Sequence, residues 1–183
     1  MDRLSAFDND AEIKELFIKF SHLYNLLGEK FLMDLQRFPA LGDMVVDRWE
    51  KAKMLGFGEG TNIYDNSLVL GNVKVGKECW IGPNTILDGS GGLEIGDFCT
   101  ISSGVQIYSH DNVKQTISSK VLPIERQKTV IGNNVYIGPQ AIITKGIVVG
   151  SNVVIGGFAL VNKNVSENSI VMGQPAKKDG EIE

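Results

Sequence analysis

The segment IGNNVYIGPQAII, residues 131–143, has an isoleucine at every sixth position, and a glycine follows two of the three. The same spacing extends in both directions over most of the chain beyond residue 60. Such a fixed period predicts an internal repeat rather than strands to be assigned one by one. The aliphatic positions are Ile63, Val69, Val75, Ile81, Leu87, Ile95, Ile101, Ile107, Ile131, Ile137, Ile143, Val149, Ile155 and Val161.

The residue two places before each aliphatic position is mostly small or β-branched, as at Cys79, Thr85 and Ala141. Because side chains alternate along a strand, both residues face the same side and form the interior. The glycine and asparagine residues between them tolerate the backbone conformations of a tight turn. The repeat therefore predicts short parallel strands wound into a three-sided coil, with adjacent coils about 4.8 Å apart.

The period also suggests how the hexads are distributed over the coils. The first coil begins at Ile63, the second at Ile81 and the third at Ile101, and the fourth and fifth are expected to begin at Ile131 and Val149. The third face of the third coil is assigned to residues 125–130, so that residues 109–124 leave the coil as a projecting loop. A short insertion at residues 89–92 falls at the same corner. Long loops in compact domains are usually functional.

An N-terminal helical segment, residues 1–60, is predicted to precede the coil at residues 61–172 and a C-terminal tail at residues 173–183. Apolar residues between Ala11 and Leu27 recur with helical spacing. The run from Asp8 to Asp10 predicts an N-cap for this helix, and Gly28 predicts its end. Shorter helices are expected at residues 31–38 and from Asp43 to Gly56. The fold class is mainly β.

Composition argues against several classes of function. The formal net charge is −4 at pH 7, so the chain lacks the basic balance of a nucleic-acid-binding protein. No apolar run is long enough to predict a transmembrane segment, and the first residues do not resemble a signal peptide, so a cytoplasmic location is expected. Two histidines cannot supply a three-histidine metal site, and no metal is expected.

The repeat, the single long loop containing His110, and the ending VMGQPAK at residues 171–177 together resemble the hexapeptide-repeat acyltransferases. The sequence is similar to the maltose, galactoside and xenobiotic acetyltransferases and to O-acetyltransferases of bacterial polysaccharide biosynthesis. This resemblance implies a left-handed parallel β-helix, although parallel crossovers are normally right-handed. It also implies a homotrimer with active sites between subunits, and acetyl-CoA as the donor.

His110 follows a predicted strand at the root of the loop, which is where the family has its catalytic histidine. The resemblance implies that it acts as a general base, taking the acceptor proton as the acceptor attacks the thioester. Asp111 orients the imidazole ring or lies in a solvated turn, and the sequence leaves both interpretations open. Because the chain has no GxSxG nucleophile motif, direct transfer is favoured over an acyl-enzyme.

The remaining site residues are also implied by the resemblance. Asn84 matches an acceptor-contacting asparagine by its spacing, although a turn asparagine is an equally good interpretation. Asp111 is a second acceptor-binding candidate. The donor groove needs backbone N–H groups near the thioester and basic residues near the nucleotide phosphates. Its candidate residues are Tyr136, Gly138, Gly157, Asn162, Lys163, Lys177 and Lys178.

The expected function is therefore transfer of acetyl from acetyl-CoA to a hydroxyl of a sugar or glycan precursor. N-acetylation of an amino sugar or nucleotide sugar is one alternative, and a non-catalytic β-helix scaffold is another. A γ-type carbonic anhydrase would need more histidines, and a serine acetyltransferase has a much larger helical domain. A scaffold would have no reason to place His110 at the base of the loop, and release of thiol from acetyl-CoA distinguishes an enzyme from a scaffold.

Overall fold

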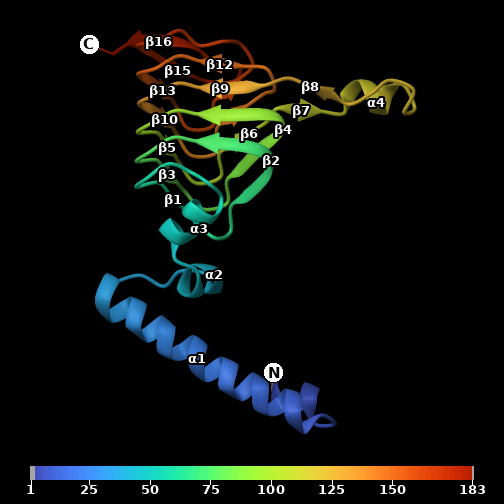
Figure 1. Cartoon of the computed structure of the whole chain (residues 1–183), viewed down its shortest axis with the longest axis vertical. Helices are drawn as coiled ribbons and strands as arrows, with labels where there is room; N and C mark the ends of the chain where they lie inside the picture. Colours follow the sequence, from blue (N-terminus) through green and yellow to red (C-terminus); the bar gives the residue numbers. More distant parts are fainter. Residues whose placement is uncertain (1–2, 183) are drawn as a thin grey trace. The chain divides into compact units, whose positions relative to one another are not determined.

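The computed structural model describes residues 3–182 and divides into two units between Val46 and Asp47. The unit that begins at Asp47 is mainly β, a parallel β-solenoid of about six coils stacked one over the next (Figure 1). The expectation of a parallel coil with N-terminal helices is confirmed. Among the described residues, no helix combines the length and the apolar character that a membrane span requires.

The first face of the solenoid is a single sheet with one strand from each coil. All neighbouring strands are parallel except the last pair, in which the chain turns back at its C-terminal end. In spatial order the strands are β1 (Asn62–Ile63), β3 (Trp80–Ile81), β5 (Thr100–Ile101), β10 (Val135–Ile137), β13 (Val153–Ile155), β15 (Ser169–Met172) and β16 (Lys177–Glu181).

The second and third faces form one continuous sheet, because two long strands bend through the corner between them. The first half of β4 pairs with β6 on the second face, and its second half pairs with β9 on the third. The strands are β2 (Leu68–Val75), β4 (Ile86–Ile95), β6 (Gln106–Ile107), β9 (Thr129–Ile131), β11 (Ile142–Ile143), β12 (Val148–Val149) and β14 (Leu160–Val161).

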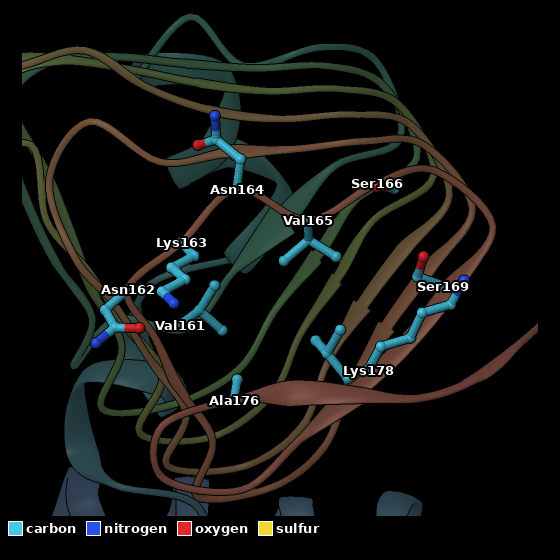
Figure 2. Close-up of a pocket in the computed structure, with 10 residues that line it drawn as sticks. Val161, Asn162, Lys163, Asn164, Val165, Ser166, Ser169, Ala176 and Lys178 are labelled. Atoms are coloured by element: carbon cyan, nitrogen blue, oxygen red, sulfur yellow. The ribbon is translucent and has the colours of Figure 1, made fainter.

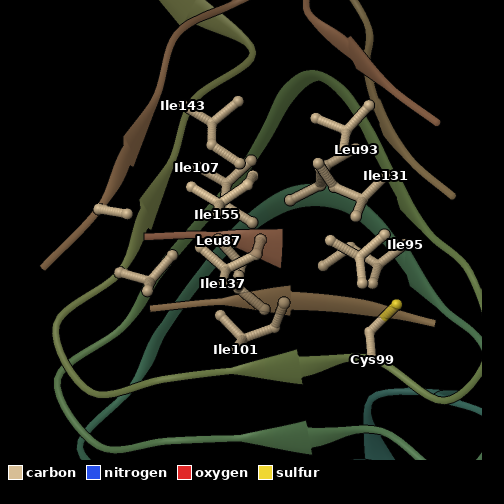
Figure 3. Close-up of a cluster of buried hydrophobic side chains, with 14 of the residues drawn as sticks. Leu87, Leu93, Ile95, Cys99, Ile101, Ile107, Ile131, Ile137, Ile143 and Ile155 are labelled. Atoms are coloured by element: carbon tan, nitrogen blue, oxygen red, sulfur yellow. The ribbon is translucent and has the colours of Figure 1, made fainter. Parts of the chain in front are cut away.

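Equivalent aliphatic residues lie in register and stack into columns inside the solenoid. Ile101 pairs with Ile81 in one direction and with Ile137 in the other, and all three side chains are fully buried. Figure 3 shows the interior filled by such isoleucine and leucine side chains, with Cys99 among them. Both cysteines are free and buried, so they pack as small apolar groups.

Strand pairing corrects the predicted layout from the third coil onward. Ile131 pairs with Ile95 of the preceding coil, so it lies on the third face of the third coil rather than starting the fourth. Ile137 pairs with Ile101 and therefore opens the fourth coil. Residues 125–130 were expected to form that third face, but their first two residues lie outside the solenoid. The loop and the insertion at residues 89–92 do share one corner, as predicted.

The projecting excursion between β6 and β9 has its own secondary structure. It begins with β7 (His110–Asp111), continues through α4 (Val113–Ile117), and returns through β8 (Glu125–Arg126), which pairs antiparallel with β7 (Figure 1). At its root, the N–H of Gln127 donates to the carbonyl of Ser109 at 2.9 Å. The excursion therefore leaves and rejoins the solenoid at one corner.

The N-terminal unit contains η1 (Leu4–Phe7), α1 (Ala11–Leu35) and α2 (Leu41–Val45). Asp10 caps α1 as predicted, because its carboxylate accepts from the N–H of Ile13 at 3.0 Å. The predicted end at Gly28 is wrong, since α1 continues to Leu35. Gly28 instead makes room for the ring of Phe38, whose Cε2 would lie 2.4 Å from an added Cβ.

A single helix was expected between Asp43 and Gly56, but the structure has two. The second, α3 (Arg48–Met54), begins after Asp47, whose carboxylate accepts from the N–H groups of Trp49 and Glu50. It belongs to the same unit as the solenoid, where Ala52 is buried in the common core. The glycine-rich residues 56–60 thus lie between this helix and the first coil, within one unit.

Candidate functional site

His110 lies at the corner where the chain leaves the third coil. It is the first residue of β7, and the preceding residue, Ser109, is fully buried. The hydroxyl of Ser109 accepts from the N–H of Gly91 at 2.7 Å, which ties this point to the insertion in the preceding coil. The side chain of His110 is therefore presented from a fixed backbone and is 33% exposed.

The imidazole of His110 is held by a carboxylate that lies below the surface. Oδ2 of Asp88 lies 2.5 Å from Nδ1 of His110, and the Asp88 side chain is only 1% exposed. The same carboxylate accepts from the N–H of Ser109 at 3.0 Å and from the N–H of Ser90 at 2.9 Å. Asp88 thus joins the insertion, the end of the third coil's second strand and the histidine.

The protonation of this pair follows from its surroundings. Burial by itself would raise the pKa of Asp88, but hydrogen bonds from Ser90, Ser109 and His110 outweigh it and lower that pKa to about 2. The carboxylate is then ionised at neutral pH and can only accept hydrogen bonds. Nδ1 of His110 must therefore carry the proton, which leaves Nε2 as the basic nitrogen of the neutral ring.

A surface cavity of about 290 Å³ lies against this histidine. Within the described part of the chain, Nε2 of His110 has no hydrogen-bond partner. A basic nitrogen beside a cavity, with its tautomer fixed by a buried carboxylate, is chemically able to accept a proton from a bound molecule. The lining residues are Tyr108, His110, Asp111, Asn112, Thr144 and Lys145.

Asp111 lies in the same cavity, but Asp88 orients the histidine ring. One oxygen of Asp111 accepts from Lys145 and the other from the N–H of Val113 at 3.1 Å. The hydrogen bond from Lys145 lowers the pKa of Asp111, so this carboxylate is also ionised at neutral pH. Of the two interpretations that the sequence left open, ring orientation by Asp111 is therefore wrong.

Three of the predicted donor-binding residues meet in a second pocket. Asn162, Lys163 and Lys178 line a pocket of about 180 Å³ at the C-terminal end of the solenoid, where β16 crosses the last coil (Figure 2). Lys178 also forms an ion pair with Glu181. Lys177 precedes it in β16 and is exposed.

The other predicted site residues lie elsewhere on the solenoid. Gly138 and Gly157 are stacked at the corner between the first and second faces, because a Cβ on Gly138 would lie 2.5 Å from the Gly157 nitrogen. Asn84 occupies the same corner with a φ of 58°, and its side chain accepts from Asn66 at 2.8 Å. Tyr136 is exposed on the first face. Within one chain, none of these four lines the cavity beside His110.

The comparisons with known proteins agree with the repeat. A family model for the bacterial transferase hexapeptide (six repeats) matches residues 128–163, and one for the hexapeptide repeat of succinyl-transferase matches residues 72–109. Protein CapG of Staphylococcus aureus is 47% identical over 92 residues, which make up 50% of this chain and 54% of CapG. The match with this relative thus extends over about half of its length.

Solved structures similar to this chain include acyltransferases. A maltose O-acetyltransferase from Clostridium difficile 630 is 27% identical, with a TM-score of 0.60 over 92% of this chain and 89% of that one. A Vibrio cholerae hexapeptide-repeat acetyltransferase complexed with acetyl coenzyme A is 20% identical, with a TM-score of 0.67 over 95% and 91%. The Bacillus cereus N-acyltransferase AntD, complexed with dTDP and 3-hydroxybutyryl-CoA, is 22% identical, with a TM-score of 0.60 over 75% and 92%. The predicted resemblance to the hexapeptide-repeat acyltransferases is confirmed.

Proposed function

We propose that this protein is an acetyltransferase that moves acetyl from acetyl-CoA to a hydroxyl of a sugar or glycan precursor. The observation that carries the proposal is the hydrogen bond between Asp88 and His110, with the free edge of the ring beside a cavity. Similarity to a maltose O-acetyltransferase and to a structure complexed with acetyl-CoA supports the donor and the acceptor class.

The reaction follows from the protonation state of this pair. An acceptor hydroxyl in the cavity donates its proton to Nε2 of His110 as its oxygen attacks the thioester carbonyl. The Asp88 carboxylate stabilises the imidazolium that forms, while Nδ1 keeps its own proton. The carbon–sulfur bond then breaks, and the imidazolium returns the proton to the departing thiolate of coenzyme A. The products are an acetyl ester and free coenzyme A.

The cavity suits a neutral polar acceptor. Its charged groups are already compensated, because Asp88 bonds to His110 and Asp111 bonds to Lys145. Polar side chains such as Asn112 and Thr144 remain in the lining to hydrogen-bond hydroxyl groups. An acceptor with a carboxylate beside its reacting group, such as serine, would need a cation, and Lys145 is already paired with Asp111. This favours a sugar over an amino acid.

The predicted donor residues suggest that the site is shared between copies of the chain. Gly138 and Gly157 lie at one corner of the solenoid, and His110 lies at the next. In a three-fold assembly, one corner of each copy faces a different corner of its neighbour. A homotrimer would therefore bring Gly138 and Gly157 of one copy to the histidine of another, and the proposal includes this arrangement.

N-acylation of an amino sugar attached to a nucleotide is the second candidate. The similarity to AntD, an N-acyltransferase complexed with dTDP, favours it. An amine acceptor also needs a base, so His110 serves either reaction. The product distinguishes them: alkali releases acetate from an ester but leaves an amide intact.

The decisive experiment measures thiol release from acetyl-CoA with a panel of free sugars, alkyl glycosides, nucleotide sugars and their amino analogues. His110→Ala is expected to lower kcat by about 10²–10⁴-fold. His22→Ala is the matched control, because His22 is exposed on α1 and should leave turnover unchanged. Near-wild-type turnover in His110→Ala would reject the mechanism. No thiol release with any acceptor would favour a scaffold.

A further inference from the structure

The two strands at the root of the excursion place two carboxylates directly opposite each other. Asp111 of β7 pairs with Glu125 of β8 in the antiparallel ribbon. Side chains at directly opposite positions lie on the same face, and like charges there destabilise the pair. The ribbon therefore needs a cation at this point.

Lys145 supplies that cation from the solenoid. Its Nζ donates to Oδ2 of Asp111 and lies 3.4 Å from Oε2 of Glu125, so a single ammonium bridges both strands. The Lys145 side chain is only 17% exposed, against 52% for Lys128 in its surface pair with Glu94. Screening by solvent is weaker for the more buried pair. Lys114 forms a second, more exposed ion pair with Glu125 at 2.5 Å.

The backbone that presents Lys145 is fixed by the fourth coil. The N–H of Thr144 donates to the carbonyl of Val161 at 3.0 Å, and the N–H of Gly146 donates to the hydroxyl of Thr129 at 3.0 Å. Gly146 has a φ of 75°, and an added Cβ would lie 2.6 Å from the side-chain oxygen of Gln127. The ammonium is thus anchored to a rigid corner of the coil that follows the ribbon.

We propose that Lys145 is a positioning residue that locks the root of the excursion to the solenoid and thereby shapes the acceptor side of the cavity beside His110. This inference rests on the proposed function. Its basis is that Lys145 and Asp111 line the cavity together with His110. His110 itself is held independently by Asp88, so loss of the lock should impair acceptor binding more than the chemical step.

The first test measures hydrogen exchange of the backbone amides in residues 110–127, which requires no substrate. In Lys145→Met, exchange in this segment should accelerate roughly tenfold, while the strands of the solenoid stay protected. Lys145→Arg retains the charge and should exchange close to wild type. Lys128→Met is the control that removes an ion pair outside the ribbon, and it should leave the segment unchanged.

A double variant tests whether charge repulsion is the cause. Glu125→Gln in the Lys145→Met background removes one of the two opposed carboxylates, so it should restore slow exchange in part. Equal exchange in Lys145→Met and wild type would overturn the proposal. So would failure of both Lys145→Arg and the double variant to recover protection, because the lysine would then be needed for packing alone.

Kinetics supply the second readout, with the sugar of the acceptor panel that is acetylated fastest. Lys145→Met should raise the KM for that sugar roughly tenfold, with kcat and the KM for acetyl-CoA changed less than about threefold. A fall in kcat with an unchanged sugar KM would overturn the proposal. If no sugar is acetylated, the proposed function fails, and hydrogen exchange still decides whether Lys145 locks the ribbon.

Discussion

Asp88 and His110 come from successive coils, and their side chains meet at 2.5 Å because Asp88 follows Leu87 within β4 and Leu87 pairs in register with Ile107 of β6. Leu87 lies beside Ile107, so the residues that follow them enter the corner together. The carboxylate of Asp88 is buried and the imidazole of His110 is partly exposed, so only the histidine end of the pair is accessible to solvent. Because Nδ1 faces the buried carboxylate, the basic nitrogen Nε2 lies on the opposite, more exposed side of the ring.

Asp88→Asn should lower kcat by about 10²-fold or more with little change in the KM for acetyl-CoA. The amide can donate to Nδ1 and so favour the tautomer in which Nε2 carries the proton and cannot accept one. Steady-state kinetics with the sugar acceptor, alongside a circular dichroism spectrum to confirm folding, test this. Unchanged kcat would show that Asp88 has only a structural role.

Asp88 should also make stability depend on pH in acid. Its pKa is lowered to about 2 in the folded protein from an ordinary value of 3.8, so its stabilising effect is present above pH 4 and is lost as the pH falls toward 2. Wild type should exceed Asp88→Asn in unfolding free energy by about 2 kcal/mol at pH 5 and by less than about 1 kcal/mol at pH 2.5. Urea titrations at both values measure the two differences. A pH-independent difference would contradict the lowered pKa.

Gly132→Ala should destabilise the solenoid by about 1–3 kcal/mol. An added Cβ would lie 2.7 Å from backbone atoms of Gly150 and Ser151 in the next coil, and that backbone cannot move without disturbing the stack. Gly180→Ala is the control, because the nearest atom to its Cβ would be a side-chain carbon at 3.6 Å. Urea denaturation compares them, and equal stabilities would refute the close approach of the coils.

Neighbouring residues of β10 should behave oppositely on truncation. Ile137 is fully buried, so Ile137→Ala should cost about 2–5 kcal/mol of unfolding free energy. Tyr136 is 44% exposed, so Tyr136→Ala should cost less than about 1 kcal/mol and instead raise the KM for acetyl-CoA. Thermal unfolding and donor kinetics on both variants separate the two effects. An unchanged KM for acetyl-CoA in Tyr136→Ala would show that this residue does not contribute to donor binding.

In solution the protein should have the mass of three copies of the 183-residue chain. Light scattering at micromolar concentration measures this directly. A monomer that still transfers acetyl would show that the residues at the two corners need not come together, and would exclude a site shared between copies.

The six-residue period is sufficient to predict which side chains face inward, because the aliphatic position is the same on every face. For that same reason it cannot predict which face follows an insertion. Ile131 continues the period after the excursion, and only its pairing with Ile95 shows that it closes the third coil. The position of a residue within its hexad can be predicted from the neighbouring sequence. The face on which that hexad lies depends on where the excursion rejoins the solenoid.

His110 was identified by its place at the root of the loop, but its partner was not. Asp88 follows an inward leucine and precedes a glycine-rich insertion, so by itself it has the appearance of a turn residue. The predicted layout already placed Leu87 one coil from Ile107, and that relationship brings Asp88 toward His110. Lys145 could not be found in the same way, because the predicted layout put Ile143 on the third face, whereas in the structure Ile143 pairs with Ile107. Side-chain bonds across coils are needed to assign both roles.

The closure of the excursion at Ser109 and Gln127 has a consequence for how such proteins diversify. Both ends of residues 110–126 reach the solenoid at one hydrogen-bonded point. The segment is therefore an insertion whose length and sequence do not affect the stacking of the coils. An insertion of another length or composition can occupy this position without shifting any strand of the solenoid. Under the proposed function, exchanging residues 112–124 would alter the acceptor side of the cavity, to which Asn112 contributes, while His110 at the root of the excursion and Asp88 in β4 keep their places.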